Sequence, residues 1–245
     1  MDTIDMPATR SAITGLIRFA ATEEEILLAA APIEDLCDGT AEAWAARPLI
    51  AHNTEFKQEQ VSRLNAVLRG ETPPEFPQID HRSDKVYREY AGRSGDAVAQ
   101  TNQRVTSELI AAVWSLPAED MLDPSRHPWL AGRPLWLQVI VRGFWHPAGH
   151  LNDYYRAHGQ PARALRLSRH AVATCDYWNA PDPARGMARY TLAGTHAYLG
   201  DTDAALTELE CAIDLNPDLR AAADRDADFG ETRKLSRFGA VVGLR

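Results

Sequence analysis

Two histidines in the middle of the chain have the spacing of a metal-binding pair. His146 and His150 lie four residues apart in a segment, Leu135 to His158, whose apolar spacing predicts a helix. At about 100° per residue, both rings project from the helix face that also carries Val139 and Gly143. Residues four apart are neighbours on a helix surface, so two neutral imidazole nitrogens can converge there on one divalent metal ion.

A third histidine stands on another predicted helix, which runs from Pro48 to Arg69. His52 falls at the edge of the apolar arc of this helix, and Asn53 and Gln60 point into the same arc. Buried polar groups need hydrogen-bond partners, so these two amides either bond within the core or line a site. Three neutral imidazoles leave the charge of a metal uncompensated and at least one coordination position open, which is typical of catalytic rather than structural sites.

Two further residues are candidates for supporting such a site. Asp153 lies on the helix face of His146 and His150, where its carboxylate would orient an imidazole by accepting a hydrogen bond from it. Trp129, in the Pro-rich segment before that helix, would roof a pocket or serve as ordinary aromatic core.

Pro147 separates the two histidines and predicts a distortion of their helix. Proline has no backbone N–H to donate, and its ring clashes with the carbonyl group four residues earlier, here that of Gly143. We therefore expect a kink or a bulge at this point, with Gly143 and Gly149 absorbing it. The distortion would either aim the two imidazoles at one point or separate them.

The segments that carry these residues indicate an all-α protein. Long runs rich in Ala, Leu, Glu and Arg have apolar residues at helical spacing, and no segment alternates as a strand does. On the first helix, the predicted buried residues are Ile13, Leu16, Ile17, Ala20, Ile26 and Leu27. The principal helical segments, joined by Pro-rich and irregular connections, predict a four-helix bundle; they are Ser11 to Ala30, Pro48 to Arg69, Ser83 to Leu116 (interrupted at Gly92 to Gly95) and Leu135 to His158.

Composition excludes several classes of function. The chain has 26 Lys and Arg against 34 Asp and Glu, a formal net charge of -8, which argues against a surface for nucleic acid or anionic membranes. Cys37, Cys175 and Cys211 are scattered and unpaired in sequence, which is typical of a reducing compartment. With no signal-peptide pattern at Met1 to Arg10 and no stretch long and apolar enough to span a bilayer, we expect a cytoplasmic protein.

After Gly159 the chain consists of shorter predicted helices and resembles a tetratricopeptide repeat. Residues at the small and apolar positions of that repeat are Leu192, Ala193, Gly200, Ala205, Leu209, Ala212 and Pro217. Arg189 replaces the aromatic residue expected near the start of the repeat. The resemblance implies a short helical solenoid over residues 159–245, closed by a capping helix and able to offer a groove to a protein or peptide partner.

The first predicted domain, residues 1–158, resembles the DinB-like superfamily of metal-binding four-helix bundles over about Ser11 to His158. The resemblance rests on a histidine in the second helix (His52), a Pro-rich crossing, and an H-x-x-x-H motif in the last helix (His146 and His150). It implies that these three histidines bind zinc or nickel. It also implies a class of activities, which includes thiol S-transferases, thiol-dependent isomerases and hydrolases.

The leading hypothesis is a metalloenzyme that activates a thiol or water against a small electrophilic substrate, with a low-molecular-weight thiol as a second cofactor candidate. Detoxification or resistance would follow by analogy with the superfamily. One alternative is a non-catalytic interaction scaffold of the tetratricopeptide type with a vestigial bundle site. A second alternative is a metal-free bundle that binds a small molecule. A homodimer is compatible with each of these hypotheses.

Overall fold

The computed structural model of the protein describes residues 6–31, 44–75 and 93–243, and within these ranges all regular elements are helices. The predicted all-α class is therefore confirmed for this part of the chain. The chain divides into two compact units, Met1–Tyr154 and Tyr155–Arg245. The division falls within a helix, close to the predicted domain boundary after His158.

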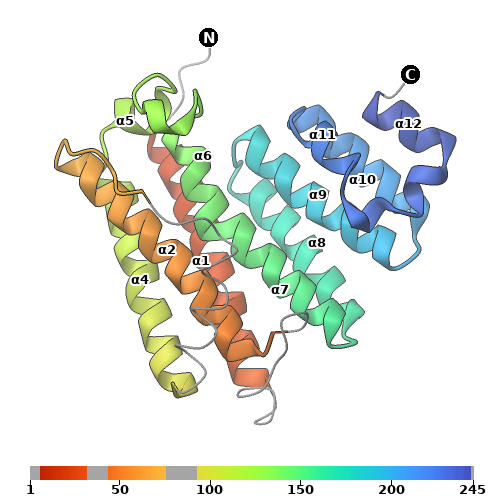
Figure 1. The fold of residues 1–245 in the computed structure, drawn as a ribbon, viewed down its shortest axis with the longest axis horizontal. Coiled ribbons are helices and arrows are strands. Elements are labelled where there is room, and N and C mark those ends of the chain that lie inside the picture. The colour runs from red at the N-terminus through yellow and green to blue at the C-terminus, as the bar shows by residue number, and fades with distance from the viewer. Residues whose placement is uncertain (1–5, 32–43, 76–92, 244–245) are drawn as a thin grey trace. The chain divides into compact units, whose positions relative to one another are not determined.

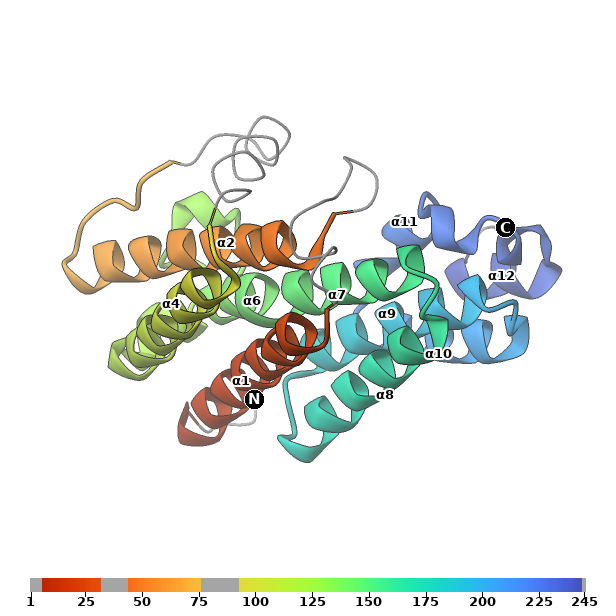
Figure 2. The ribbon, with the colours of Figure 1, turned by 90° about the horizontal axis from the view of Figure 1, so that it is seen from below.

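The first unit is built on long helices that pack against one another (Figures 1 and 2). Helix α2 packs against α4, and α1 packs against α2, α4, α6 and η2. The elements are α1 (Met6–Ala30), α2 (Ala46–Leu68), α4 (Gly95–Ser115), α5 (Ala118–Leu122), η1 (Pro128–Leu130), α6 (Leu135–Ile140), η2 (Val141–Trp145) and α7 (His146–Ala157).

Local signals explain where several of these helices begin and end. Ser94 caps α4, because its side chain accepts a hydrogen bond from the backbone N–H of Ala97 at 3.2 Å. Gly70 follows α2 with a positive φ of 71°, which a glycine adopts without strain. The segment predicted as a loop from Pro117 to Pro134 contains two short helices, α5 and η1. The predictions for residues 32–43 and 76–92 lie outside the described residues.

The prediction that Ile26 of α1 is buried is wrong. Ile26 is 44% exposed, whereas Glu24 is completely buried and occupies the inward face together with Ala20 and Leu27. The buried positions follow one another at helical spacing, and Glu24 falls between Ala20 and Leu27 on that arc. The inward face of α1 therefore carries a carboxylate in place of an apolar side chain, and Ile26 turns outward.

The second unit consists of shorter helices joined by tight turns. Helix α8 packs on α9, and α9 packs on α10. The elements are α8 (Pro161–Tyr177), α9 (Asp182–Tyr198), α10 (Thr202–Leu215), α11 (Leu219–Ala223), η3 (Ala227–Phe229), η4 (Thr232–Lys234) and α12 (Ser236–Val242). The small and apolar positions that suggested a repeat are buried here, among them Ala193, Ala205, Leu209 and Ala212. Consecutive helical hairpins are thus present, and their membership of the tetratricopeptide family stays a prediction.

Ion pairs and hydrogen bonds within the second unit hold its C-terminal segment. Arg156 donates two hydrogen bonds to the carboxylate of Asp228, at 2.5 and 2.7 Å. The hydroxyl of Tyr190 donates to Asp226 at 2.7 Å, and Asp226 also accepts from the backbone N–H of Asp228 at 3.0 Å. Burial of Tyr190, and then its bond to Asp226, raise the pKa of the phenol, so it remains a donor at neutral pH.

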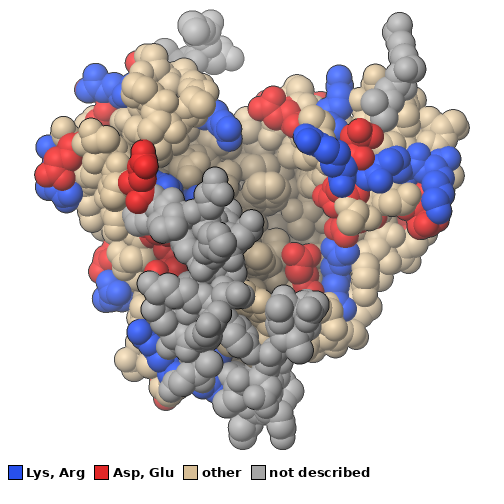
Figure 3. All heavy atoms as spheres, viewed as in Figure 1, with Lys and Arg blue, Asp and Glu red and all other residues tan. Residues whose placement is uncertain are grey.

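The surface carries both signs of charge. Figure 3 shows Lys and Arg side chains interspersed with Asp and Glu over the face in view. In the part of the chain that the structure describes, no helix has the length and apolar character needed to cross a bilayer.

Candidate metal centre

The histidine-bearing helix contains the distortion predicted from Pro147. Residues Val141–Trp145 form a turn of π-helix, and the backbone N–H of His146 bonds the carbonyl of Val141, five residues earlier. An α-helix through this point would require an N–H from Pro147 and would press its ring against the carbonyl of Gly143. The wider turn relieves both conflicts, and α7 continues regularly from His146.

Gly143 allows this π turn to lie close to the neighbouring helices. A Cβ atom at this position would stand 2.8 Å from Cγ1 of Ile17 on α1 and 3.1 Å from Cδ2 of Leu109 on α4. Since real Cβ contacts are not that short, only glycine fits without a shift of these side chains. This close approach to α1 and α4 fixes the position of η2 in the core. It therefore also fixes the position of His146, the residue that directly follows η2.

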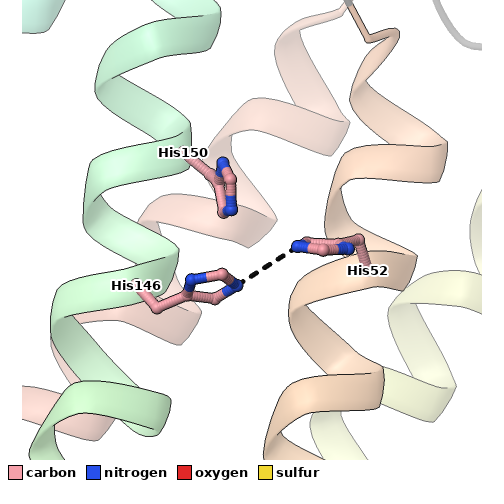
Figure 4. A group of neighbouring side chains, drawn as sticks. All are labelled: His52, His146 and His150. Atoms are coloured by element: carbon pink, nitrogen blue, oxygen red, sulfur yellow. Dashed lines mark hydrogen bonds between the residues drawn. The ribbon is translucent and has the colours of Figure 1, made fainter. Parts of the chain in front are cut away.

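His52, His146 and His150 form one cluster, in which the rings turn toward a common point (Figure 4). The Nε2 atoms of His52 and His146 are 3.2 Å apart. The ring centroids of His146 and His150 are separated by 4.3 Å, and those of His52 and His150 by 5.0 Å. One potential ligand atom from each residue lies within 4.8 Å of the other two. The π turn therefore leaves the two histidines of α7 on the side that faces α2.

The donor set fits a divalent transition metal. Two nitrogens bound at about 2.1 Å to a tetrahedral ion lie about 3.4 Å apart, close to the 3.2 Å between His52 and His146. The full span of up to 4.8 Å is wider than this, so at least one imidazole must turn as the third nitrogen closes on the ion. Three imidazoles, with no thiolate beside them among the described residues, suit zinc, nickel or another borderline metal rather than calcium or magnesium.

The three rings differ in their exposure and in their aromatic neighbours. His52 is only 3% exposed, whereas His146 and His150 are half-buried. The ring of Phe56, one turn after His52, stacks on His146 with centroids 4.3 Å apart and contacts His52 at 4.6 Å. Trp44 packs edge-on against His52 at 5.1 Å. Phe56 thus restricts two of the three imidazoles.

The protonation state of His150 suits metal binding. Burial lowers the pKa of His150, and the negative charge of Glu24 opposes part of this shift. The ring is therefore neutral near pH 7, which is the form that offers a nitrogen lone pair to a metal.

A cluster of buried polar side chains lies deeper in the first unit. The carboxylate of Glu24 accepts from Lys57 at 2.6 Å, from Asn102 at 2.9 Å and from Asn53 at 3.0 Å. Lys57 also donates to the side-chain oxygen of Asn102 at 2.5 Å, and Thr54 approaches the same oxygen at 3.2 Å. We refer to these five residues as the polar cluster. Every member is buried, and together they join α1, α2 and α4.

The other residues predicted for the site have different surroundings. Asn53 belongs to the polar cluster, while the buried amide of Gln60 has no hydrogen-bond partner among the described residues. Asp153 is exposed on α7, and its predicted role in orienting an imidazole stays a prediction. The ring of Trp129 lies 5.9 Å from the guanidinium carbon of Arg63. Because Arg63 is about three turns along α2 from His52, this contact places Trp129 away from the three histidines.

Several residues around the histidines were missed by reasoning from sequence. Phe56 was not singled out from the sequence, and the guanidinium of Arg142 lies 4.5 Å from its ring centroid. Glu24 and Lys57 were not considered, because charged residues on a helix are normally solvated. The available signal for Glu24 was its place in the arc between Ala20 and Leu27.

Comparison of the chain with protein-family models, with curated proteins and with solved structures finds no match. The chemistry of the site therefore rests on its own geometry. The resemblance to DinB-like bundles, drawn from the order of three histidines and a Pro-rich crossing, stays a prediction.

Proposed function

We propose that the first unit is a DinB-like metalloenzyme domain that binds one divalent ion, zinc or nickel, through His52, His146 and His150. The observation that carries the proposal is the convergence of three imidazoles from α2 and α7, with one ligand atom of each within 4.8 Å of the others. A metal held by three neutral imidazoles supplies Lewis acidity and lowers the pKa of a water or thiol bound to it.

The residues of this chain have separate roles in that proposal. His52 is buried and held between Trp44 and Phe56, so it sets the position of the centre. His146 and His150 are half-buried and leave the site accessible to a small reactant. No further ligand from the described residues joins these three imidazoles, so coordination positions remain for a reactant, as in hydrolytic and thiol-transferring metal sites. A small electrophile and a low-molecular-weight thiol, or water, are the reactants that this centre would bring together.

The proposal is tested by metal analysis of protein purified without a His-tag. We expect about one equivalent of zinc or nickel per chain. Cobalt(II) bound in place of that metal should give the visible absorption spectrum of an ion with a low coordination number. His150→Ala should fold as the wild type does, since the ring is half-buried. It should lose metal affinity by more than the ~10–100-fold that is typical of removing a supporting residue.

His158→Ala is the matched control, because His158 lies just after α7 and outside the cluster. Its metal affinity should equal that of the wild type. A folded wild-type protein that holds no metal and has no affinity for added zinc, nickel or cobalt would refute the proposal. In that case the interaction scaffold or the metal-free binding bundle becomes the better hypothesis.

Activity is tested with the metal-loaded protein, a small thiol such as 2-mercaptoethanol and a chromogenic aryl halide. We expect the wild type to accelerate thiol transfer and His150→Ala to lose that acceleration. If the protein consumes the electrophile equally fast when no thiol is added, the activity is that of a hydrolase instead.

A further inference from the structure

The ion pair between Glu24 and Lys57 is unusually deep in the first unit. Their side chains are 0% and 1% exposed, and the carboxylate oxygen lies 2.6 Å from the ammonium nitrogen. The free-energy cost of removing two charges from water offsets most of their attraction. A buried ion pair therefore seldom stabilises a protein more than apolar side chains of similar size do. Stability alone therefore does not account for this pair.

The polar cluster adjoins the histidines through α2. Asn53, which donates to Glu24, is the residue directly after His52, and Lys57 directly follows Phe56. Phe56 itself contacts the rings of His52 and His146. Glu24 thus holds the stretch of α2 that carries His52, one of the ligands. The same stretch carries Phe56, whose ring restricts His146, a second ligand.

The charge of Glu24 lies close to the site. Its carboxylate is one hydrogen bond away from Asn53, the residue that directly follows His52. In Figure 4 the ribbon of α1 passes behind the three rings, and α1 packs against both α2 and η2. A negative charge at this depth, in surroundings of low dielectric constant, is felt more strongly by a nearby cation than it would be in water.

We propose that Glu24 is a positioning and charge-balancing residue of the metal centre, acting on His52 through Asn53 and on the bound ion through its field. This inference rests on the proposed metal binding. Three neutral imidazoles leave two positive charges on a divalent ion, and a fixed carboxylate behind them offsets part of that charge. Lys57 and Asn102 hold the carboxylate in place by donating to it.

The test compares cobalt(II) affinity with stability in three variants. Glu24→Gln removes the charge but leaves Lys57 buried without its partner, so it should lose both stability and affinity. The double variant Glu24→Gln/Lys57→Met removes both charges and should recover stability. If the carboxylate serves the metal, the double variant should still bind cobalt(II) about tenfold more weakly than the wild type.

Leu64→Ala is the control for destabilisation. Leu64 is fully buried on α2, three turns from His52, and its truncation leaves a cavity without touching the polar cluster. This variant should unfold at a lower urea concentration than the wild type. In buffer without urea, where it is folded, it should keep wild-type cobalt(II) affinity, measured by visible absorption against a competing chelator.

The outcomes separate this inference from the proposed function. A double variant with wild-type affinity would show that the polar cluster only supports the fold, and the role of Glu24 would be refuted while metal binding stands. A wild type that does not bind cobalt(II) would refute metal binding itself. An affinity loss of equal size in Leu64→Ala would show that affinity follows stability, which also overturns the role of Glu24.

Discussion

His52 is nearly enclosed, whereas His146 and His150 are half-buried. The ring of Phe56 covers His146 from one side, and Trp44 meets the edge of His52. At the scale of single residues, aromatic contacts therefore restrict two of the three imidazoles, His52 and His146.

Residue type did not by itself reveal which polar groups are buried. Glu24 occupies a core position of α1, and Ile26 next to it is exposed. A helical arc identifies inward positions, but it does not say that a carboxylate there has partners on other helices. Those partners, Lys57 and Asn102, are far away in sequence.

The two cysteines in the described part of the chain should differ sharply in reactivity. Burial raises the pKa of Cys175 to about 12, so its thiol stays protonated at pH 8, whereas Cys211 is exposed. Brief treatment of the folded protein with iodoacetamide at pH 8 should alkylate Cys211 and spare Cys175. Peptide mass spectrometry measures both sites, and equal labelling of the two in folded protein would contradict the burial of Cys175. In urea both should react.

At the scale of elements, the π turn η2 joins two regular helices and sets the direction of α7. Pro147, which disfavours a regular α-helix here, is evident in the sequence, and so is Gly143 within the turn. The close contact of Gly143 with Ile17 and Leu109 depends on α1 and α4, which pack against η2 only in the folded unit. The sequence predicted a distortion, and packing selected the π form.

Two glycines of this region should respond to alanine in opposite ways. Gly143→Ala places a Cβ 2.8 Å from Ile17, and overpacking of this kind should destabilise the first unit by about 1–3 kcal/mol. A Cβ at Gly149, within α7, would meet no described atom inside 4 Å, so Gly149→Ala should stabilise by up to about 1 kcal/mol. Urea unfolding measures both. Stabilisation by Gly143→Ala would contradict the close approach of η2 to α1.

At the scale of the whole molecule, the chain contains two units with different internal organisation. The first unit contains long helices around a core with a polar cluster, and the second contains short hairpins of closely packed small residues. In the second unit, the C-terminal segment is fixed by Asp226 and Asp228, which bond Tyr190 and Arg156. These contacts tie the C-terminal segment to α9 and to the first residues of the second unit.

Removing the carboxylate of Asp226 should loosen the second unit. Asp226→Ala deletes the acceptor of the Tyr190 hydroxyl and of the Asp228 N–H, and should destabilise that unit by about 1–3 kcal/mol. Hydrogen exchange followed by mass spectrometry should show faster exchange in η3 and α9. Asp224→Ala, at an exposed neighbouring aspartate, is the control and should change stability by less than about 0.5 kcal/mol. Equal effects would contradict the anchoring role of Asp226.

The amino-acid sequence by itself determined the helical class, the approximate spans of α1, α2 and the histidine-bearing helix, and the distortion at Pro147. It also selected the three histidines. Each of these depends on periodicity or on backbone constraints that act over a few residues. Only the tertiary structure decided that the imidazoles of His52 and His146 approach to 3.2 Å, that Glu24 turns inward, and that Trp129 packs near Arg63. Such contacts join residues distant along the chain, and they are fixed by how whole helices pack rather than by any local pattern.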